Sequence, residues 1–334
     1  MRVSVIGAGS WGTAVAALAA ASTDTILWAR RAELADRIQS RRVNPDYLPD
    51  TRLPDRLRAT SDLEEAVSGT EMLIMAVPSH GFREVLSSGA AAVPARVPIV
   101  SLTKGIETGT LKRMTEVILD VVDTDPNSVG VLTGPNLARE IAAGQPAAAV
   151  IGMPDETMGA KLQALLMGPT FRVYTNPDVV GCESAGALKN VMAIAAGMAH
   201  GLGYGDNSMA ALVTRALAEL TRLGIAMGGQ PLTFAGLAGM GDLVATCFSS
   251  QSRNRTVGVE LGRGRSLREV TEEMHMVAEG VKSTEAVLAL ADGHAIEMPI
   301  ARAVGGVLYD GLKPADMVNA LMARDAKSEL HGLA

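Results

Sequence analysis

The chain has 334 residues, of which 48% are hydrophobic and 20% charged, and its formal net charge is −6. This composition is ordinary for a globular protein and excludes a wholly disordered, collagenous or disulfide-rich chain. The negative balance argues against a general attraction to nucleic acid, although a local basic pocket can still hold a small anion. At about 150 residues per domain, the length predicts two domains.

The sequence indicates neither a membrane span nor a disulfide or metal framework. No apolar run reaches the roughly 18 residues that a spanning helix needs, so we expect no membrane insertion. Cys182 and Cys247 are far apart, and the five histidines show no metal-ligand spacing. We therefore expect no metal and a reducing compartment, the cytoplasm.

Short apolar runs alternate with helix-length segments through the first half of the chain. The runs are rich in Val, Ile and Leu, which is typical of strands buried on both faces of a parallel sheet. They lie at Val3–Ile6, Thr25–Trp28, Met72–Val77, Ile99–Leu102, Val129–Leu132, Ala147–Ile151 and Phe171–Tyr174. Helices are predicted between them, for example at Trp11–Ala21 and Ala32–Ser40. This alternation predicts an α/β fold with a Rossmann-type parallel sheet and right-handed crossovers.

The strand signals stop near residue 178. From Cys182 onward the chain is rich in Ala, Leu, Met and Gly, in a pattern typical of helices. We therefore predict a Rossmann-type domain over residues 1–178 and an all-helical domain over residues 179–334.

A glycine-rich motif, Gly7-Ala8-Gly9-Ser10-Trp11-Gly12, follows the first predicted strand and opens the first predicted helix. In a dinucleotide-binding turn, the first glycine permits a tight bend and the second lets the backbone approach a pyrophosphate. The third glycine allows close packing of helix on strand. Amides at the helix start then face the phosphate charge. The motif predicts a dinucleotide site, and the alternative is a glycine-rich turn without a ligand.

The residues after the second predicted strand bear on the choice of dinucleotide. Many dinucleotide folds have an acidic residue there for the adenosine ribose, whereas this chain has Arg30 and Arg31. Two guanidinium groups suit a 2′-phosphate better than a free 2′-hydroxyl, so NADP is favoured over NAD. The alternative is that one or both arginines form the solvated start of a helix.

Four further segments carry a more specific signal. They are Thr103-Lys104-Gly105, Gly134-Pro135-Asn136-Leu137-Ala138-Arg139-Glu140, the stretch from Glu183 through Lys189-Asn190 to Arg215, and Gly239-Met240-Gly241-Asp242 followed by Ser252-Arg253-Asn254-Arg255. Together with the glycine motif they resemble, in order and over nearly the whole chain, the bacterial NAD(P)-dependent glycerol-3-phosphate dehydrogenases.

The resemblance implies reversible hydride transfer between NAD(P)H and dihydroxyacetone phosphate, a small phosphorylated triose, to give sn-glycerol 3-phosphate for phospholipid synthesis. It also implies a homodimer. The first domain would then bind the dinucleotide, and the second would bind substrate and carry out catalysis. The active site is expected in the cleft between them.

The resemblance also implies roles for particular residues, with Lys189 as the catalytic proton-transferring group. Substrate contacts fall on Lys104, Gly134, Asn136, Lys189, Asp242, Ser252, Arg253 and Asn254. Cofactor contacts fall on Ser10, Trp11, Arg30, Arg31, Lys104, Ala138, Arg253, Val277 and Glu279, besides Gly7, Gly9 and Gly12 of the motif. At position 136 the family more often has Ser or Thr, which leaves the exact contact of Asn136 open.

The residues support this chemistry on their own. Hydride transfer to a ketone leaves negative charge on its oxygen, which must then receive a proton. Lys189 can meet both needs, and it lies in an apolar helical run where a cation is costly unless it faces a polar cleft. The alternative is a lysine that extends to the surface. Asp242 can orient Lys189 or cap a helix, and Arg253 can bind a phosphate.

Two alternative functions remain at this point. One is another two-domain reductase, such as a 3-hydroxyacid dehydrogenase or a ketopantoate reductase. The other is a non-catalytic module that senses a dinucleotide.

Overall fold

The computed structural model describes residues 1–274, 278–326 and 328–329, and the chain forms two compact units. The first unit comprises Met1–Lys104 and Lys112–Val179, and the second comprises Gly105–Leu111 and Val180–Ala334. The predicted domain over residues 1–178 differs from the first unit in the segment 105–111. This segment belongs to the helical unit because Ile106 is buried in the core of that unit and Leu111 packs against the same core.

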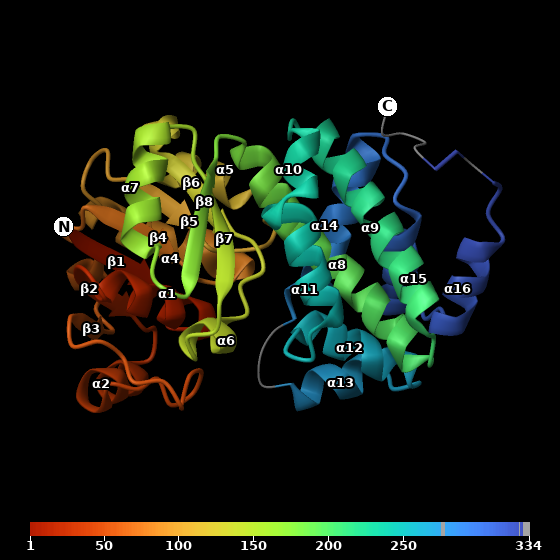
Figure 1. Cartoon of the computed structure of the whole chain (residues 1–334), viewed down its shortest axis with the longest axis horizontal. Helices are drawn as coiled ribbons and strands as arrows, with labels where there is room; N and C mark the ends of the chain where they lie inside the picture. Colours follow the sequence, from red (N-terminus) through yellow and green to blue (C-terminus); the bar gives the residue numbers. More distant parts are fainter. Residues whose placement is uncertain (275–277, 327, 330–334) are drawn as a thin grey trace. The chain divides into compact units, whose positions relative to one another are not determined.

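One eight-stranded sheet forms the centre of the first unit (Figure 1). Its strands are β1 Arg2–Ile6, β2 Asp24–Trp28, β3 Leu57–Thr60, β4 Met72–Met75, β5 Ile99–Ser101, β6 Val129–Thr133, β7 Ala147–Gly152 and β8 Phe171–Asn176. The strands lie in the order β3-β2-β1-β4-β5-β6-β7-β8. The first six strands of this order are arranged as in a Rossmann fold. The predicted fold class is confirmed.

The structure differs from the predicted sheet in two places. The edge strand β3 was not predicted, because its four residues carry only one buried apolar side chain, that of Leu57. The pair β6–β7 is antiparallel, whereas all other neighbouring strands are parallel. The connection between β6 and β7 includes only the five-residue helix α6 (Ala138–Ala142), and an antiparallel pair needs no crossover helix.

Helices pack against both faces of this sheet. They are α1 Ser10–Ala20, α2 Ala32–Arg41, α3 Leu63–Val67, α4 Ser79–Gly89, α5 Met114–Val121, α6 and α7 Glu156–Leu166. Successive strand residues point to opposite faces, so Val5 joins one core cluster and Ile6 the other. Val15 of α1 packs in the first cluster, and Phe82 of α4 packs in the second. The sheet is therefore covered by apolar helix faces on both sides, as its apolar strands predict.

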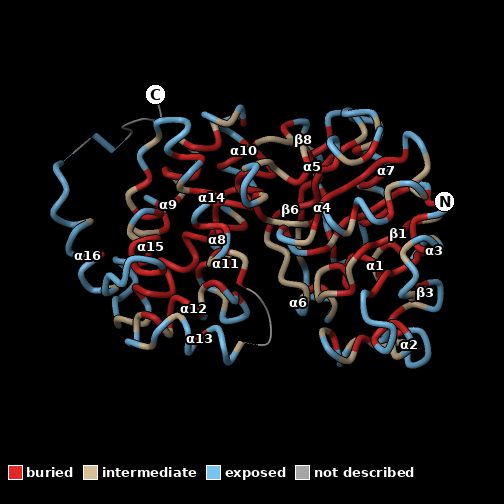
Figure 2. Tube along the Cα trace, turned by 180° about the vertical axis from the view of Figure 1, so that it is seen from behind, coloured by how far each residue is buried: buried red, intermediate tan, exposed pale blue. Residues whose placement is uncertain are grey.

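The second unit is helical throughout the residues that the structure describes, as predicted. Its helices are α8 Val179–Gly201, α9 Asp206–Ala226, α10 Pro231–Ala235, α11 Asp242–Phe248, α12 Arg253–Gly262, α13 Leu267–Glu273, α14 Glu279–Gly293, α15 Pro299–Tyr309 and α16 Pro314–Met322, with a π-helical turn at Leu237–Gly241. The central helix is α8, in which every residue from Gly181 to Ala199 is buried (Figure 2). By length and composition α8 is apolar enough to cross a membrane, but 89% of its most apolar window is buried inside the protein, as in a core helix.

Two glycines bring α12 unusually close to α8. A Cβ on Gly197 of α8 would lie 2.2 Å from the carbonyl oxygen of Arg255, and a Cβ on Gly258 of α12 would lie 2.1 Å from that of Ile194. Only glycine permits this approach of two backbones. The crossing holds the middle of α12 against the C-terminal half of α8, the helix that carries Lys189.

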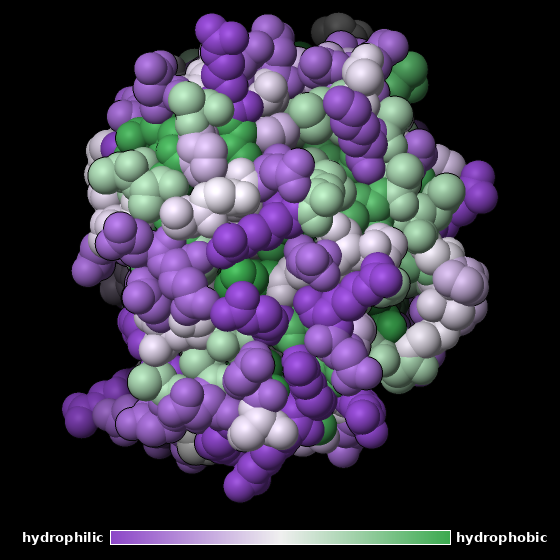
Figure 3. Space-filling model, turned by 90° about the vertical axis from the view of Figure 1, so that its left-hand side faces the viewer, coloured by the Kyte–Doolittle hydropathy of each residue, from purple (hydrophilic) through white to green (hydrophobic). Residues whose placement is uncertain are grey.

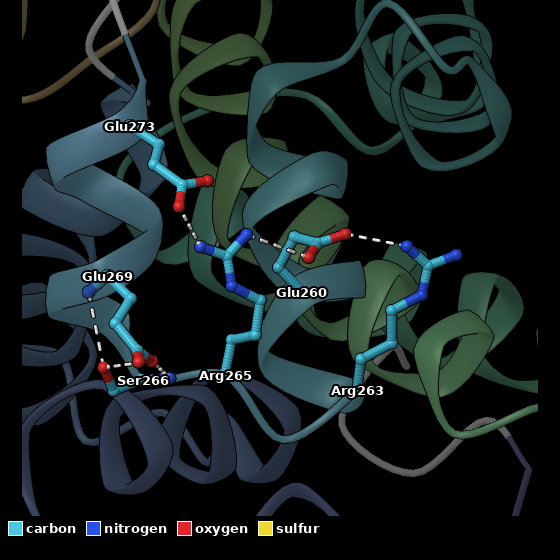
Figure 4. Close-up of polar contacts among 6 residues, drawn as sticks. All are labelled: Glu260, Arg263, Arg265, Ser266, Glu269 and Glu273. Carbon is cyan, nitrogen blue, oxygen red and sulfur yellow. Dashed lines mark hydrogen bonds and ion pairs between the residues drawn. The ribbon is translucent and has the colours of Figure 1, made fainter.

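The turn from α12 to α13 is held by charged side chains and a helix cap (Figure 4). The Arg265 guanidinium contacts Glu260 at 3.3 Å and Glu273 at 2.6 Å, and both carboxylates raise the pKa of Arg265. Ser266 and Glu269 form a reciprocal capping box at the first turn of α13. Hydrogen bonds from Ser266 lower the pKa of the Glu269 carboxyl. The local direction of α13 is therefore set by polar contacts at its start.

Glu219 of α9 is a buried carboxyl group that caps another helix. Its Oε1 accepts a hydrogen bond from the Ile300 amide at 2.8 Å, and its Oε2 accepts one from the Ala301 amide at 3.3 Å. These amides belong to the first turn of α15, where backbone donors have no intrahelical acceptor. Burial raises the pKa of Glu219 to about 7, although the two backbone hydrogen bonds favour the charged form.

We expect the Glu219→Gln variant to show a flatter dependence of stability on pH than the wild type. Because the pKa of Glu219 is raised from 4.5 to about 7, its contribution is full below pH 4.5 and is lost as pH rises through about 7. This loss amounts to about 1–3 kcal/mol in the wild type and is absent from a side chain that cannot ionise.

Chemical denaturation of both proteins at pH 5, near the lower end of this window, and at pH 8, above its upper end, measures the difference. The matched control is Glu285→Gln, which removes an exposed carboxylate from α14. Equal pH slopes for the wild type and the Glu219→Gln variant would contradict the assignment.

Candidate functional site

The residues predicted for the site lie in both units. The first unit contains Gly7, Gly9, Ser10, Trp11, Gly12, Arg30, Arg31, Lys104, Gly134, Asn136 and Ala138. The second contains Lys189, Asp242, Ser252, Arg253, Asn254 and Glu279. Val277 lies outside the described residues.

The three motif glycines have different surroundings. Gly7 has a φ of +122°, and a Cβ there would lie 2.5 Å from the carbonyl oxygen of Ala76. A Cβ on Gly12 would lie 2.0 Å from the carbonyl oxygen of Gly7. A Cβ on Gly9, by contrast, would meet no atom of the described chain within 4 Å. Gly7 and Gly12 thus serve the fold itself, and Gly9 leaves an open cradle at the start of α1.

The start of α1 suits a phosphate group. Gly9 is the N-cap residue, it makes no side-chain cap, and the first turn of this 11-residue helix contains no acidic residue. Its amides and the helix dipole therefore favour an anion beside the cradle, as a dinucleotide pyrophosphate requires. The Trp11 indole packs edge-on against Phe171, with ring centroids 6.3 Å apart, so this side chain is part of the core.

Asn44, which the sequence analysis did not select, holds the glycine loop in place. Its side-chain amide is buried and donates to the Ala8 carbonyl at 2.9 Å and to the Thr13 hydroxyl at 2.8 Å. An asparagine before Pro45 is typical of a turn, so the local sequence gives no sign of partners more than 30 residues away.

Arg30 and Arg31 follow the carboxyl end of β2, and both are exposed. Arg31 is the N-cap residue of α2, and its guanidinium forms an ion pair with Asp46. The hydrogen bond to this carboxylate raises the pKa of Arg31. Both arginines thus lie where a Rossmann fold receives the adenosine ribose, but Arg31 already has an anionic partner.

Lys104 and Gly134 are brought together at the carboxyl edge of the sheet. Lys104 follows β5 and Gly134 follows β6, and the Lys104 ammonium donates to the Gly134 carbonyl at 2.9 Å. Nearby in sequence, the side-chain nitrogen and oxygen of Asn136 are buried without a hydrogen-bond partner in the described part of the chain. Because buried amides are nearly always hydrogen-bonded, Asn136 has the properties of a group that binds a ligand. Ala138 begins α6, the next helix.

Lys189 and Asp242 form a buried ion pair within the helical unit. Their side chains are 6% and 2% exposed, and the Lys189 ammonium lies 2.6 Å from Asp242 Oδ1. The ammonium also donates to the Thr246 hydroxyl. The alternative of a surface lysine is therefore excluded. A buried cation is tolerated here because a carboxylate and a hydroxyl satisfy it.

Thr246 completes this cluster and was not selected from the sequence. Its hydroxyl donates to the Asp242 carbonyl at 2.6 Å, four residues earlier in α11. The spacing from Asp242 to Thr246 places both on one helix face, which is the signal that could have identified the threonine.

On the same helix, burial raises the pKa of the Cys247 thiol to about 12, and the Asp242 charge adds to this effect. The thiol therefore stays protonated beside the pair.

The predicted phosphate-binding segment begins α12. Ser252 is its N-cap residue, and its hydroxyl accepts from the Arg255 amide at 3.2 Å. Asn254 is buried, and its Oδ1 accepts from the Gly280 amide at 2.9 Å, which connects α12 to the start of α14 beside Glu279. Arg253 is exposed at the first helical position. Ser252 and Asn254 thus have structural hydrogen bonds, and Arg253 is an exposed cation beside them.

A Rossmann sheet with an open glycine cradle, joined to a helical unit with a buried lysine–aspartate pair, defines a dinucleotide-dependent dehydrogenase. The family models of NAD-dependent glycerol-3-phosphate dehydrogenase match this chain, the N-terminal model over residues 2–159 and the C-terminal model over residues 178–319. The chain belongs to this family, which confirms the resemblance found in the sequence.

Individual relatives cover the whole chain. Glycerol-3-phosphate dehydrogenase (NAD(P)+) 2 of Sphingopyxis alaskensis is 54% identical over 99% of both chains. The glycerol-3-phosphate dehydrogenase (NAD(P)+) of Streptomyces coelicolor is 51% identical over 98% of both. The crystal structure of glycerol-3-phosphate dehydrogenase from Coxiella burnetii has a TM-score of 0.92 and 38% identity, covering 97% of this chain and 99% of the other.

Proposed function

We propose that this protein is an NAD(P)-dependent glycerol-3-phosphate dehydrogenase, which transfers hydride reversibly between NAD(P)H and dihydroxyacetone phosphate to give sn-glycerol 3-phosphate. The buried pair of Lys189 and Asp242 carries this proposal, in a chain with full-length relatives of that activity. A module that only senses a dinucleotide does not require a proton donor satisfied in this way.

The chain's own residues handle the proton and the charge. The dinucleotide supplies the hydride when it is bound. Lys189 holds a proton at Nζ, stabilises the negative charge that develops on the substrate oxygen, and delivers the proton to that oxygen. Asp242 and Thr246 orient the ammonium through their contacts at Nζ, and the Asp242 carboxylate balances its charge.

The remaining predicted residues bind and orient the ligands. We assign the substrate phosphate to Arg253, since an exposed guanidinium can form charge-assisted hydrogen bonds to phosphate oxygens. Further substrate contacts are assigned to Lys104, Gly134, Asn136, Ser252 and Asn254. Cofactor contacts are assigned to Gly9, Ser10, Trp11, Arg30, Arg31, Lys104, Ala138, Arg253 and Glu279, and to Val277 outside the described residues. We also propose a homodimer, a cytoplasmic location and a role in phospholipid synthesis.

Two glycine variants separate the cofactor cradle from the fold. Gly9→Ala places a methyl group in open space, so thermal stability should be unchanged while NADPH affinity falls about tenfold or more. Gly12→Ala forces a Cβ against the Gly7 carbonyl and should lower stability itself, by about 1–3 kcal/mol. Thermal unfolding and calorimetric NADPH titration of both variants test this. Unchanged NADPH affinity in Gly9→Ala would show that the cradle does not hold the dinucleotide.

An assay of substrate choice tests the proposed function. Oxidation of NADH and of NADPH is followed in parallel with dihydroxyacetone phosphate, ketopantoate and a 3-oxo acid as substrates. We expect fast oxidation with the triose phosphate alone. Preference for either acid would instead support one of the other two-domain reductases.

A further inference from the structure

The Asp46 carboxylate pairs with Arg31, one of the two arginines predicted to meet a 2′-phosphate, and with Arg37. Asp46 lies in the connection between α2 and β3, and its Oδ2 pairs with Arg31 while its Oδ1 lies 3.2 Å from the Arg37 guanidinium. Each oxygen of one carboxylate thus has its own guanidinium partner. The two arginines come from the N-cap and the second turn of α2, just beyond the carboxyl end of β2.

The segment that carries Asp46 is anchored to the fold. Two residues earlier, the Asn44 amide is buried and bonds to Ala8 in the glycine loop. Two residues later, Leu48 is buried, and its amide donates to the Asn44 carbonyl at 2.9 Å. The Asp46 side chain is only 26% exposed, against 53% for Arg31. The segment that carries Asp46 is therefore tied to the glycine loop through Asn44.

Figure 3 shows a face of the first unit whose lower part, at the height of α2 in Figure 1, is mainly hydrophilic. On such a polar surface, the Asp46 carboxylate acts on a bound ligand through its negative charge.

We propose that Asp46 sets the cofactor selectivity of this enzyme by neutralising Arg31 and so weakening its interaction with the 2′-phosphate of NADP. The inference rests on the proposed place of Arg31 beside the adenosine ribose. A 2′-phosphate carries between one and two negative charges at neutral pH, so it meets an arginine that is already paired and a second anion beside it. The 2′-hydroxyl of NAD is neutral and is not repelled.

The size of the effect follows from the exposure of the pair. Partly exposed ion pairs are weak because water screens them, so removing Asp46 should change affinity by about fivefold and not by orders of magnitude. The direction is set by charge: the loss of the carboxylate leaves Arg31 without this anionic partner, so its guanidinium can bond to the incoming phosphate.

The test is an Asp46→Asn variant, with affinities measured by calorimetry for NADPH, NADH, 2′,5′-ADP and 5′-AMP. We expect NADPH and 2′,5′-ADP to bind about fivefold more tightly than to the wild type, with NADH and 5′-AMP within about twofold. Asp36→Asn removes the same charge from the exposed surface of α2 and should leave all four affinities unchanged. An Arg31→Gln change in the Asp46→Asn background should abolish the gain.

Three results would overturn the proposal. The first is unchanged binding of 2′,5′-ADP in Asp46→Asn. The second is weaker binding of NADH and 5′-AMP, which would place the carboxylate on the ribose hydroxyls instead. The third is a gain that persists without Arg31. If the wild-type protein bound neither NADH nor NADPH, the proposed function would itself be wrong, which is a distinct outcome.

Discussion

Lys189→Met should lower the kcat for reduction of dihydroxyacetone phosphate by about 10²–10⁴-fold, the usual size of general acid catalysis. Without the ammonium, the substrate oxygen that accepts negative charge loses its proposed proton donor. NADPH affinity should stay within about twofold, since the glycine cradle belongs to the other unit. Single-turnover oxidation of NADPH and calorimetric titration measure the two quantities separately.

The stability of this variant needs its own control. Removing Lys189 takes away the cation that balances the buried Asp242 carboxylate, at a cost of about 3–5 kcal/mol. The double variant Lys189→Met/Asp242→Asn carries no such charge and should be more stable than the single variant, yet equally inactive. Lys282→Met removes an exposed lysine from the same unit and should retain full activity. A folded Lys189→Met protein with nearly normal turnover would refute the role of Lys189.

Arg253→Ala should raise the KM for dihydroxyacetone phosphate by about 10–100-fold, because a hydrogen bond between guanidinium and phosphate is charge-assisted. Dihydroxyacetone, which lacks the phosphate, should be reduced equally slowly by variant and wild type. Steady-state kinetics with both substrates measures this difference. The matched control is Arg263→Ala, at the other end of α12, where the guanidinium pairs with Glu260 on the surface. A KM that stays unchanged would place the phosphate elsewhere.

The sequence predicts the central sheet well because its strands are buried on both faces. Runs such as Val3–Ile6 and Ile99–Leu102 are almost continuously apolar. Such a run predicts a strand where helices cover both faces of the sheet. The edge strand β3 is covered less and lacks this signal. The apolar run at β7 indicates that a strand is present but not which way it runs, so the antiparallel pairing of β7 with β6 could not be predicted.

In the candidate site, too, the sequence predicts local patterns but not the partners of side chains that are distant in the chain. The glycine motif and the lysine in an apolar helix are local patterns, and both could be selected from the sequence. The clamp of Asn44 on the glycine loop and the pairing of Asp46 with Arg31 join residues 36 and 15 positions apart, through a segment whose local sequence is typical of a turn. Such contacts depend on how the loop returns to the sheet, which the sequence pattern does not specify.

The most direct test of the account is a single-turnover reaction of the wild type and of Lys189→Met, each loaded with NADPH and mixed with dihydroxyacetone phosphate. We predict that the wild type forms sn-glycerol 3-phosphate with stoichiometric NADPH oxidation, while the variant retains bound NADPH and forms almost no product. Product formation by the variant at the wild-type rate would contradict the assignment of Lys189 as the proton donor.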